Sequence, residues 1–127
     1  MSIEQNKALV RRWTGACITM DLDSLIKVID DFYTSDYTLH HPGSPDIVGI
    51  EGIEKYIREF SKDMSNFHWT IEDIFGEEDK VVARYATRYT QVSTANQISF
   101  LSVSIFHFTN GKIAEEWEFI LPENGQE

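Results

Sequence analysis

The sequence predicts an α+β domain in which three N-terminal helices pack on one face of a curved antiparallel β-sheet. In the first half of the chain, apolar residues recur every three or four positions, as they do along one face of a helix. After Ser65 the spacing changes to two, the period of a strand, and β-branched and aromatic residues become frequent. A length of 127 residues is typical of one domain, so we expect a single domain over residues 1–127.

The first predicted helix starts after Ser2, whose spacing to Gln5 is that of an N-terminal capping box. The second covers the segment DLDSLIKVIDDFY, with Asp21 or Asp23 as its cap, and the third begins near Ile50. Between the last two, DYTLHHPGSPDIVG is expected to hold two short extended pieces around a Pro-Gly turn. The inward-facing helical residues are expected to be Leu9, Val10, Trp13, Ala16, Cys17, Met20, Leu25, Ile26, Ile29, Ile53, Tyr56, Ile57, Phe60 and Met64.

Four strands are expected in the second half of the chain. Their sequences are FHWTIEDIF, KVVARYATRYTQV, ISFLSVSIFHF and KIAEEWEFI. The segments GEEDK, STANQ and TNGK separate them and have turn composition, so the strands should form a meander.

The composition excludes several classes of partner. Only 11 Lys and Arg residues oppose 21 Asp and Glu residues, and the formal net charge of −10 argues against nucleic acid or an anionic membrane. We find no apolar signal core and no stretch of membrane-spanning length, so a soluble cytoplasmic protein is expected. Cys17 is the only cysteine, which excludes an intramolecular disulfide.

Four segments, taken in order, resemble the SnoaL-like (polyketide cyclase-like) branch of the nuclear transport factor 2-like (NTF2-like) superfamily. They are FYTSDYTLHHP, GIEGIEKYIREF, EDIFGEEDKVVARYATR and FHFTNGKIAEEWEF, and the similarity runs from Leu9 to about Leu121. The resemblance implies a cone-shaped domain with a deep apolar pocket at its open end, commonly as a homodimer. It also implies aldol ring closure, isomerisation, dehydration or epoxide hydrolysis, or ligand binding without catalysis.

Two departures from the family pattern make a polyketide substrate and epoxide hydrolysis less expected than the other activities. The link TQVSTANQIS between the second and third long strands is short and contains neither Gly nor Pro, so the pocket mouth should differ from that of the polyketide cyclases. No pair of aspartates around an arginine matches the catalytic set of the epoxide hydrolase relatives, which disfavours that chemistry.

The last strand carries three candidate acids. Strict alternation places Glu115 and Trp117 on the same face as Ile113, with Glu116 and Glu118 on the other. If the apolar face lines the cone, Glu115 is the inward acid, with a pKa raised by desolvation. The resemblance instead places the catalytic acid at Glu118, and a single β-bulge would exchange the two roles. The alternative is that all three acids are solvated.

Several further side chains are candidates for the site. Of the adjacent His40 and His41, we select His40, because the DY…H spacing resembles a family position near the pocket mouth; it would shuttle a proton or bind a carbonyl. The hydroxyl of Tyr37 is a candidate donor to an oxyanion. For His107, a position in the core is favoured over one in the pocket.

The remaining candidates for substrate binding are Arg84, Trp13 and Trp117. An inward Arg84 would hold a carboxylate or enolate, although an exposed or dimer-facing row with Arg88 is favoured. The tryptophans should fill the core or line the cavity. No metal-ligand spacing and no nucleotide-binding glycine motif occurs in the sequence, so neither a metal nor a cofactor is expected.

The leading hypothesis is a small cofactor-free enzyme, a cyclase, isomerase or dehydratase, that acts on an apolar carbonyl-bearing small molecule. Glu118 or Glu115 would move a proton next to the carbonyl, and His40 or a tyrosine would stabilise the oxyanion. One alternative is a module that only binds a small molecule. Another is an interaction domain whose sheet face and charge recruit a basic partner, and there Glu116 would lie in the interface.

Overall fold

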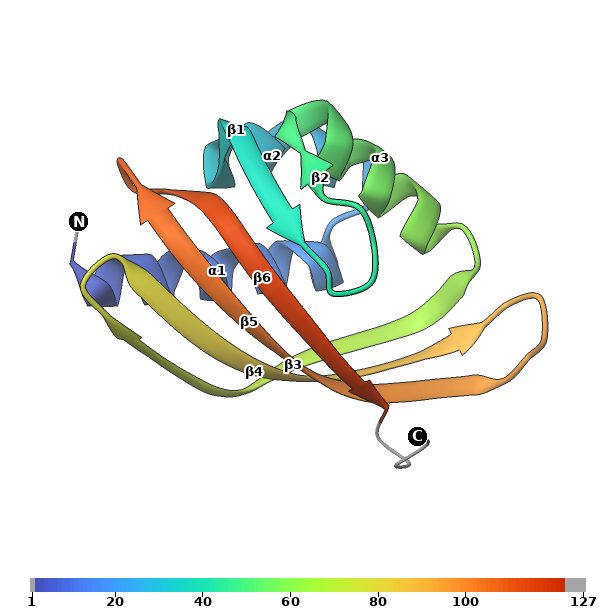
Figure 1. Cartoon of the computed structure of the whole chain (residues 1–127). Helices are drawn as coiled ribbons and strands as arrows, with labels where there is room; N and C mark the ends of the chain where they lie inside the picture. Colours follow the sequence, from blue (N-terminus) through green and yellow to red (C-terminus); the bar gives the residue numbers. More distant parts are fainter. Residues whose placement is uncertain (1, 123–127) are drawn as a thin grey trace.

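The computed structural model describes residues 2–122, which form three helices on one face of a curved six-stranded sheet (Figure 1). The predicted α+β class and arrangement are confirmed. No helix within residues 2–122 is long and apolar enough to cross a membrane. The elements in chain order are α1 (Ile3–Thr19), α2 (Leu22–Phe32), β1 (Tyr33–His40), β2 (Ile47–Val48), α3 (Gly49–Ser61), β3 (Met64–Glu77), β4 (Lys80–Gln91), β5 (Gln97–Thr109) and β6 (Lys112–Pro122).

Side chains cap the starts of the first two helices. The backbone N–H of Gln5 donates to Ser2 Oγ over 3.1 Å, and the Gln5 side chain accepts from the Ser2 backbone N–H, which completes the predicted capping box. Asp21 caps α2 by accepting from the backbone N–H of Ser24. The predicted second helix extended to Tyr33, but α2 ends at Phe32 and Tyr33 has extended backbone angles. The chain therefore passes directly from α2 into β1.

The four predicted strands form the antiparallel part of the sheet, β3 to β6. The two extended pieces expected between the second and third helices are the strands β1, which begins earlier at Tyr33, and β2. The order of the six strands in the sheet is β2-β1-β6-β5-β4-β3. β1 pairs in parallel with β6, placing His40 beside Trp117, and β2 pairs with β1. This pairing brings the segment with the two adjacent histidines next to the glutamates of the last strand.

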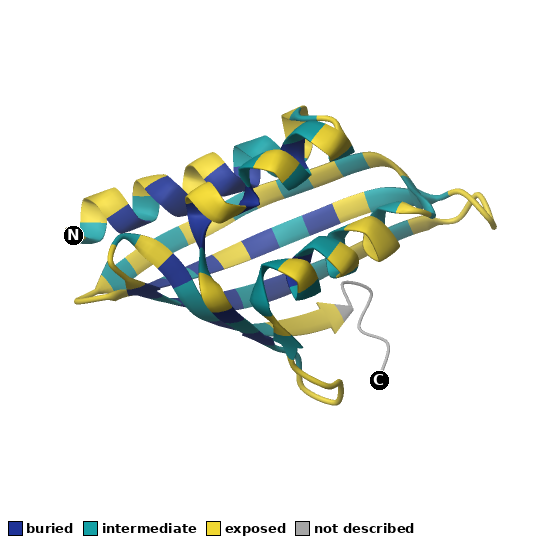
Figure 2. Ribbon diagram, turned by 90° about the horizontal axis from the view of Figure 1, so that it is seen from above, coloured by how far each residue is buried: buried dark blue, intermediate teal, exposed yellow. Residues whose placement is uncertain are grey.

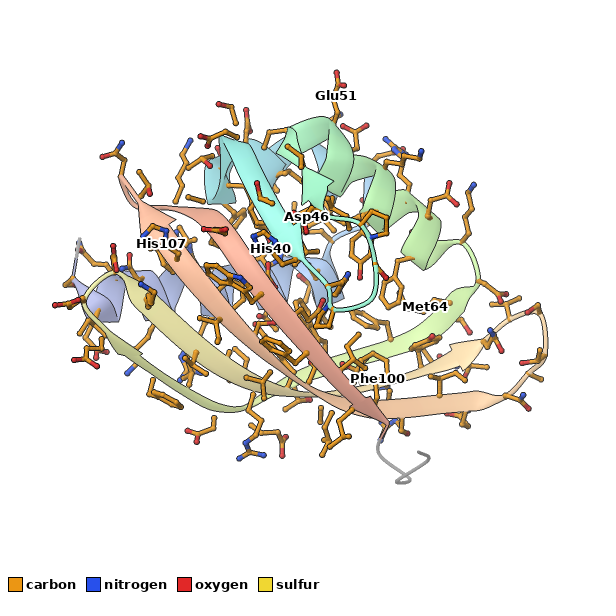
Figure 3. The ribbon with its side chains drawn as sticks, in the orientation of Figure 1. His40, Asp46, Glu51, Met64, Phe100 and His107 are labelled. Carbon is orange, nitrogen blue, oxygen red and sulfur yellow. The ribbon has the colours of Figure 1, made fainter. Side chains whose placement is uncertain are left out.

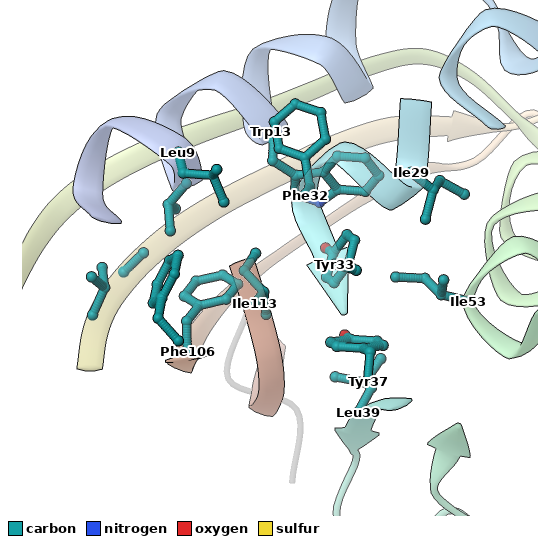
Figure 4. Packing of buried hydrophobic residues seen from close by; sticks show 14 of the residues in the cluster. Leu9, Trp13, Ile29, Phe32, Tyr33, Tyr37, Leu39, Ile53, Phe106 and Ile113 are labelled. Carbon is teal, nitrogen blue, oxygen red and sulfur yellow. The ribbon is translucent and has the colours of Figure 1, made fainter. Parts of the chain in front are cut away.

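The core lies between α1, the first part of β1 and the inner face of the sheet (Figure 4). The Trp13 ring of α1 contacts Phe32 and Tyr33 at centroid distances of 5.1 and 5.0 Å. Phe106 and Ile113 are almost fully buried on the sheet side of this cluster. Viewed from above, buried residues follow the lower face of α1 and the strand segments beneath it (Figure 2). This packing closes one end of the molecule.

A β-bulge in β6 sets the orientation of the last strand. Phe108 pairs with Ile113, whereas the preceding residue, His107, pairs with Glu115, so Ala114 is the extra residue. Ile113 is fully buried on the core side, and the extra residue then turns Glu116 to that same side. Strict alternation from Ile113 would have turned Glu115 inward.

We expect Gly76→Ala to destabilise the fold, by roughly 1 to 3 kcal/mol. A Cβ atom at position 76 would lie 2.7 Å from the backbone oxygen of Lys80 and 3.1 Å from Cγ2 of Ile3, where the β3–β4 hairpin meets α1. Urea unfolding measures the loss as a lower midpoint. Gly15→Ala is the matched control: it lies within α1 with open space around it and should stabilise by about 0.5 to 1 kcal/mol. Equal midpoints for the two variants would contradict this packing.

Candidate active site

A cavity of about 230 Å³ opens between the inner face of the sheet and the helices, beyond the closed end of the core. Met64 and Phe100 lie at this end of the molecule, whereas His107 lies at the opposite end (Figure 3). The walls are mainly apolar and aromatic. Lining residues include Trp13, Cys17, Met20, Leu25, Tyr33, Tyr37, Leu39, Ile53, Tyr56, Ile57, Phe60, Phe67, Trp69, Thr87, Phe100, Glu116, Glu118 and Ile120.

Two carboxyl groups from β6 belong to this otherwise apolar lining. Glu116 and Glu118 are two residues apart and share the inner strand face. Only 8% of Glu116 is exposed, and the Glu118 side chain is 15% exposed. Glu116 therefore lies deep in the site, and Glu118 lies nearer to solvent.

Tyr37 holds Glu116 from the neighbouring strand. Its hydroxyl donates a hydrogen bond of 2.8 Å to Glu116 Oε1, and the whole Tyr37 side chain is buried. Burial raises the pKa of Tyr37 well above its usual range, so the phenol stays protonated as a donor. The buried Ser104 hydroxyl lies close enough to favour the charged form of Glu116, but it makes no well-formed hydrogen bond within residues 2–122.

His41 binds the outer carboxyl group. Its Nε2 lies 2.5 Å from Glu118 Oε1, and both side chains are 15% exposed. The hydrogen bond to Glu118 raises the pKa of His41, because the imidazolium form is the better partner for a carboxylate. The His41 ring also contacts Tyr56 of α3 at a centroid distance of 5.5 Å. This pair joins the end of β1 to β6 at the mouth of the cavity.

The electrostatics of the inner acid suit proton transfer. Burial raises the pKa of Glu116 to about 8, and the charge of Glu118 acts in the same direction, while the hydrogen bond from Tyr37 opposes the shift. Glu116 therefore holds a proton at neutral pH in an apolar site. An acid with a pKa near the working pH can both donate and accept a proton.

A family model for the SnoaL-like domain matches residues 10–116. The chain belongs to the SnoaL-like family. The predicted resemblance is confirmed, and it places the cavity within the fold shared by this family. No curated protein matches the sequence.

Solved structures show the same fold at low sequence identity. A protein of Jannaschia sp. CCS1 named as a SnoaL-like polyketide cyclase is 17% identical over 94% of this chain and 88% of its own, with a TM-score of 0.84. Bal32a, from a soil-derived mobile gene cassette, is 18% identical over 97% of this chain and 94% of its own, with a TM-score of 0.81. An epoxide hydrolase of M. tuberculosis described as LEH-like is 13% identical over 94% of this chain and 84% of its own, with a TM-score of 0.75. Such identities establish the fold alone.

Three of the predicted site residues line the cavity of this SnoaL-like chain: Glu118, Tyr37 and Trp13. The sequence interpretation did not single out Glu116 as a lining residue, nor His41 as the partner of Glu118 at the cavity mouth. It placed Glu116 on the same face as Glu118 and left open which face is inward; the bulge at Ala114 turns this face toward the cavity.

Glu115, His40 and Trp117 lie together on the outer face of the sheet. His40 Nε2 is 2.6 Å from Glu115 Oε2, its Nδ1 is 3.0 Å from Asp46 Oδ1, and its ring stacks on Trp117 at 5.3 Å. Of the two orientations that the sequence left open, the one with Glu115 facing the cavity is therefore wrong. His41 contacts Glu118 on the inner face, and since neighbouring residues of an extended chain point to opposite faces, His40 lies on the outer face.

Arg84 and His107 also lie outside the cavity. Arg84 is exposed on β4, as the favoured interpretation expected. His107 is not a core residue: it is partly exposed, and its Nε2 lies 3.0 Å from Asp79 Oδ2. Within residues 2–122, no cluster of three or more His, Cys, Asp or Glu side chains is arranged to hold a metal ion.

We expect wild-type stability to fall as pH rises from about 5 towards 8. The pKa of Glu116 is higher in the folded state than its ordinary 4.5, so the folded state binds the proton more tightly and loses stability as it is removed. The contribution reaches at most about 1.4 kcal/mol per pH unit. His41 and His40, with raised pKa values, act in the same direction.

Urea unfolding of wild type and Glu116→Gln at pH 5.5 and pH 8 measures the contribution of Glu116. The variant keeps the histidine contributions, so it should lose less stability than wild type over this interval. Parallel losses in the two proteins would show that Glu116 titrates normally.

Proposed function

We propose that this protein is a cofactor-free enzyme that uses acid–base chemistry on an apolar, carbonyl-bearing small molecule in the cavity. The observation that carries the proposal is the buried, protonated Glu116 held by Tyr37 beside Glu118. The apolar walls strengthen each hydrogen bond to the substrate, because little water competes. The family includes proteins named for the cyclisation of polyketides, and this chemistry is consistent with that class.

In the proposed reaction, Glu118 removes a proton from the carbon next to the carbonyl. The Glu116 carboxylic acid donates its proton to the carbonyl oxygen as negative charge develops there. When Glu118 returns its proton to another carbon and the enol O–H proton goes back to Glu116, the product is an isomer. When the enol carbon instead attacks a second carbonyl, the new alkoxide takes the proton from Glu118, the enol O–H proton goes back to Glu116, and a ring is closed. Tyr37 keeps Glu116 oriented, and His41 holds Glu118 at the cavity mouth.

Hydrogen exchange tests the proposal without knowledge of the natural substrate. The probe is 2-tetralone in D₂O, followed by NMR for deuterium uptake next to the carbonyl. Wild type should accelerate exchange, and Glu118→Gln should reduce the accelerated rate by about 10² to 10⁴. Glu115→Gln changes an acid of the same strand on the outer face and should retain the rate. A rate no higher than in buffer, or equal losses in the two variants, would overturn the assignment.

The pH dependence of exchange identifies the role of Glu116. If its protonated form is the acid, the rate should fall as pH rises through about 8. Glu116→Gln should lower the rate and remove this decline, because an amide does not titrate. A decline of the same shape in the variant would assign it to another group.

We also propose that the outer face of the sheet forms a homodimer interface. Neighbouring apolar side chains cross three strands there, with Val82 beside Ile105 and Val103 beside Phe119. Phe119 and Leu121 are 46% and 63% exposed in the isolated chain. An apolar surface of this kind is typical of an interface between protein chains.

Phe119→Lys should convert the proposed dimer to a monomer, since it places a charge within that apolar face. Sedimentation velocity measures the change in mass. Val48→Lys, at an exposed apolar residue of the short strand β2, is the control and should leave the dimer intact. A wild-type monomer would contradict the proposal.

A further inference from the structure

The charged groups that line the cavity are all acidic. Glu116 and Glu118 belong to the lining, and no Lys or Arg side chain does among the described residues. The nearest cation is the imidazole of His41, which already binds Glu118. A carboxylate or phosphate ligand would therefore be buried beside Glu116 without a counter-ion, which is energetically costly.

Aromatic rings form much of the remaining wall. The faces of such rings attract cations, and the attraction grows when water is excluded. Together with the two carboxyl groups, an aromatic lining favours a cation over an anion as the ligand. The aromatic lining residues are Trp13, Tyr33, Tyr37, Tyr56, Phe60, Phe67, Trp69 and Phe100.

We propose that the cavity binds an apolar amine as its ammonium ion, with Glu116 as the counter-ion. The ammonium N–H donates to the Glu116 carboxylate, a charge-assisted hydrogen bond, and the apolar body of the amine contacts the aromatic walls. The formal net charge of −10 attracts cations to the protein from solution. This inference concerns binding alone and does not require the proposed catalysis.

Binding is coupled to the release of a proton. An ammonium ion from solution meets Glu116 in its protonated form, and the ion pair forms when that proton passes to the buffer. His41 is a titratable neighbour of Glu116, and its hydrogen bond to Glu118 raises its pKa. Five further titratable groups around Glu116 stay protonated near neutral pH, because burial raises the pKa of each. These groups are Cys17 of α1, Tyr33 and Tyr37 of β1, Tyr56 of α3 and Tyr85 of β4.

Isothermal titration calorimetry at pH 7 with three matched probes tests this inference. Benzylamine is the cation, benzyl alcohol the neutral analogue and benzoate the anion. Benzylamine should bind at least about tenfold more tightly than benzyl alcohol, and benzoate should bind more weakly than both. Repeating the benzylamine titration in buffers of different ionisation enthalpy should show the release of a proton.

Two isosteric variants test whether Glu116 is the group that binds the ammonium ion. Glu116→Gln should reduce benzylamine affinity to the level of benzyl alcohol and abolish proton release, while its retained benzyl alcohol binding shows that the cavity is folded. Glu115→Gln removes one negative charge on the outer face and should keep the preference. Equal binding of amine and alcohol by wild type, no saturable binding of benzylamine, or an unchanged preference in Glu116→Gln would overturn the inference. The result of the ketone exchange assay is independent of this test, because that assay measures turnover and not the binding of an amine.

Discussion

The parallel pairing of β1 with β6 is the constraint on which the candidate site depends. Tyr37 and His41 come from the first third of the chain, and their partners Glu116 and Glu118 come from its last strand. Neither strand alone contains a complete hydrogen-bonded pair of the site. Residues 79 and 77 positions apart in the sequence meet only because the two strands lie side by side. The three helices pack above them, and helices and strands together supply the apolar walls around these polar pairs.

Burial of an acid beside a second acid is unfavourable for folding, and the structure limits the cost in two ways. Glu116 keeps its proton, which avoids placing a second negative charge beside Glu118, and it accepts a hydrogen bond from Tyr37. Glu118 binds the His41 imidazole. A deep polar group retained at this cost, in a cavity otherwise built from aromatic and aliphatic side chains, is typical of a functional site.

The sequence predicted the helices, the four long strands and the family, because those follow from local periodicity, caps and turn residues. It predicted Glu118, Tyr37 and Trp13 at the cavity as well. The inward acid could not be assigned, since the bulge at Ala114 has no distinctive local signal: alanine is common in ordinary strands. His41 was missed for a different reason. Its face is set by the register of β1 against a strand more than seventy residues away, and local spacing does not contain that information.

The two adjacent histidines have a structural consequence beyond their separate contacts. His40 is held by Glu115 and Asp46 on the outer face, while His41 is held by Glu118 at the mouth of the cavity. Sliding β1 by one residue along β6 would exchange the two rings and break the contacts on both faces at once. The two histidines thus fix the register of β1 against β6 through contacts on both faces of the sheet. That register also sets the position of Tyr37 relative to Glu116.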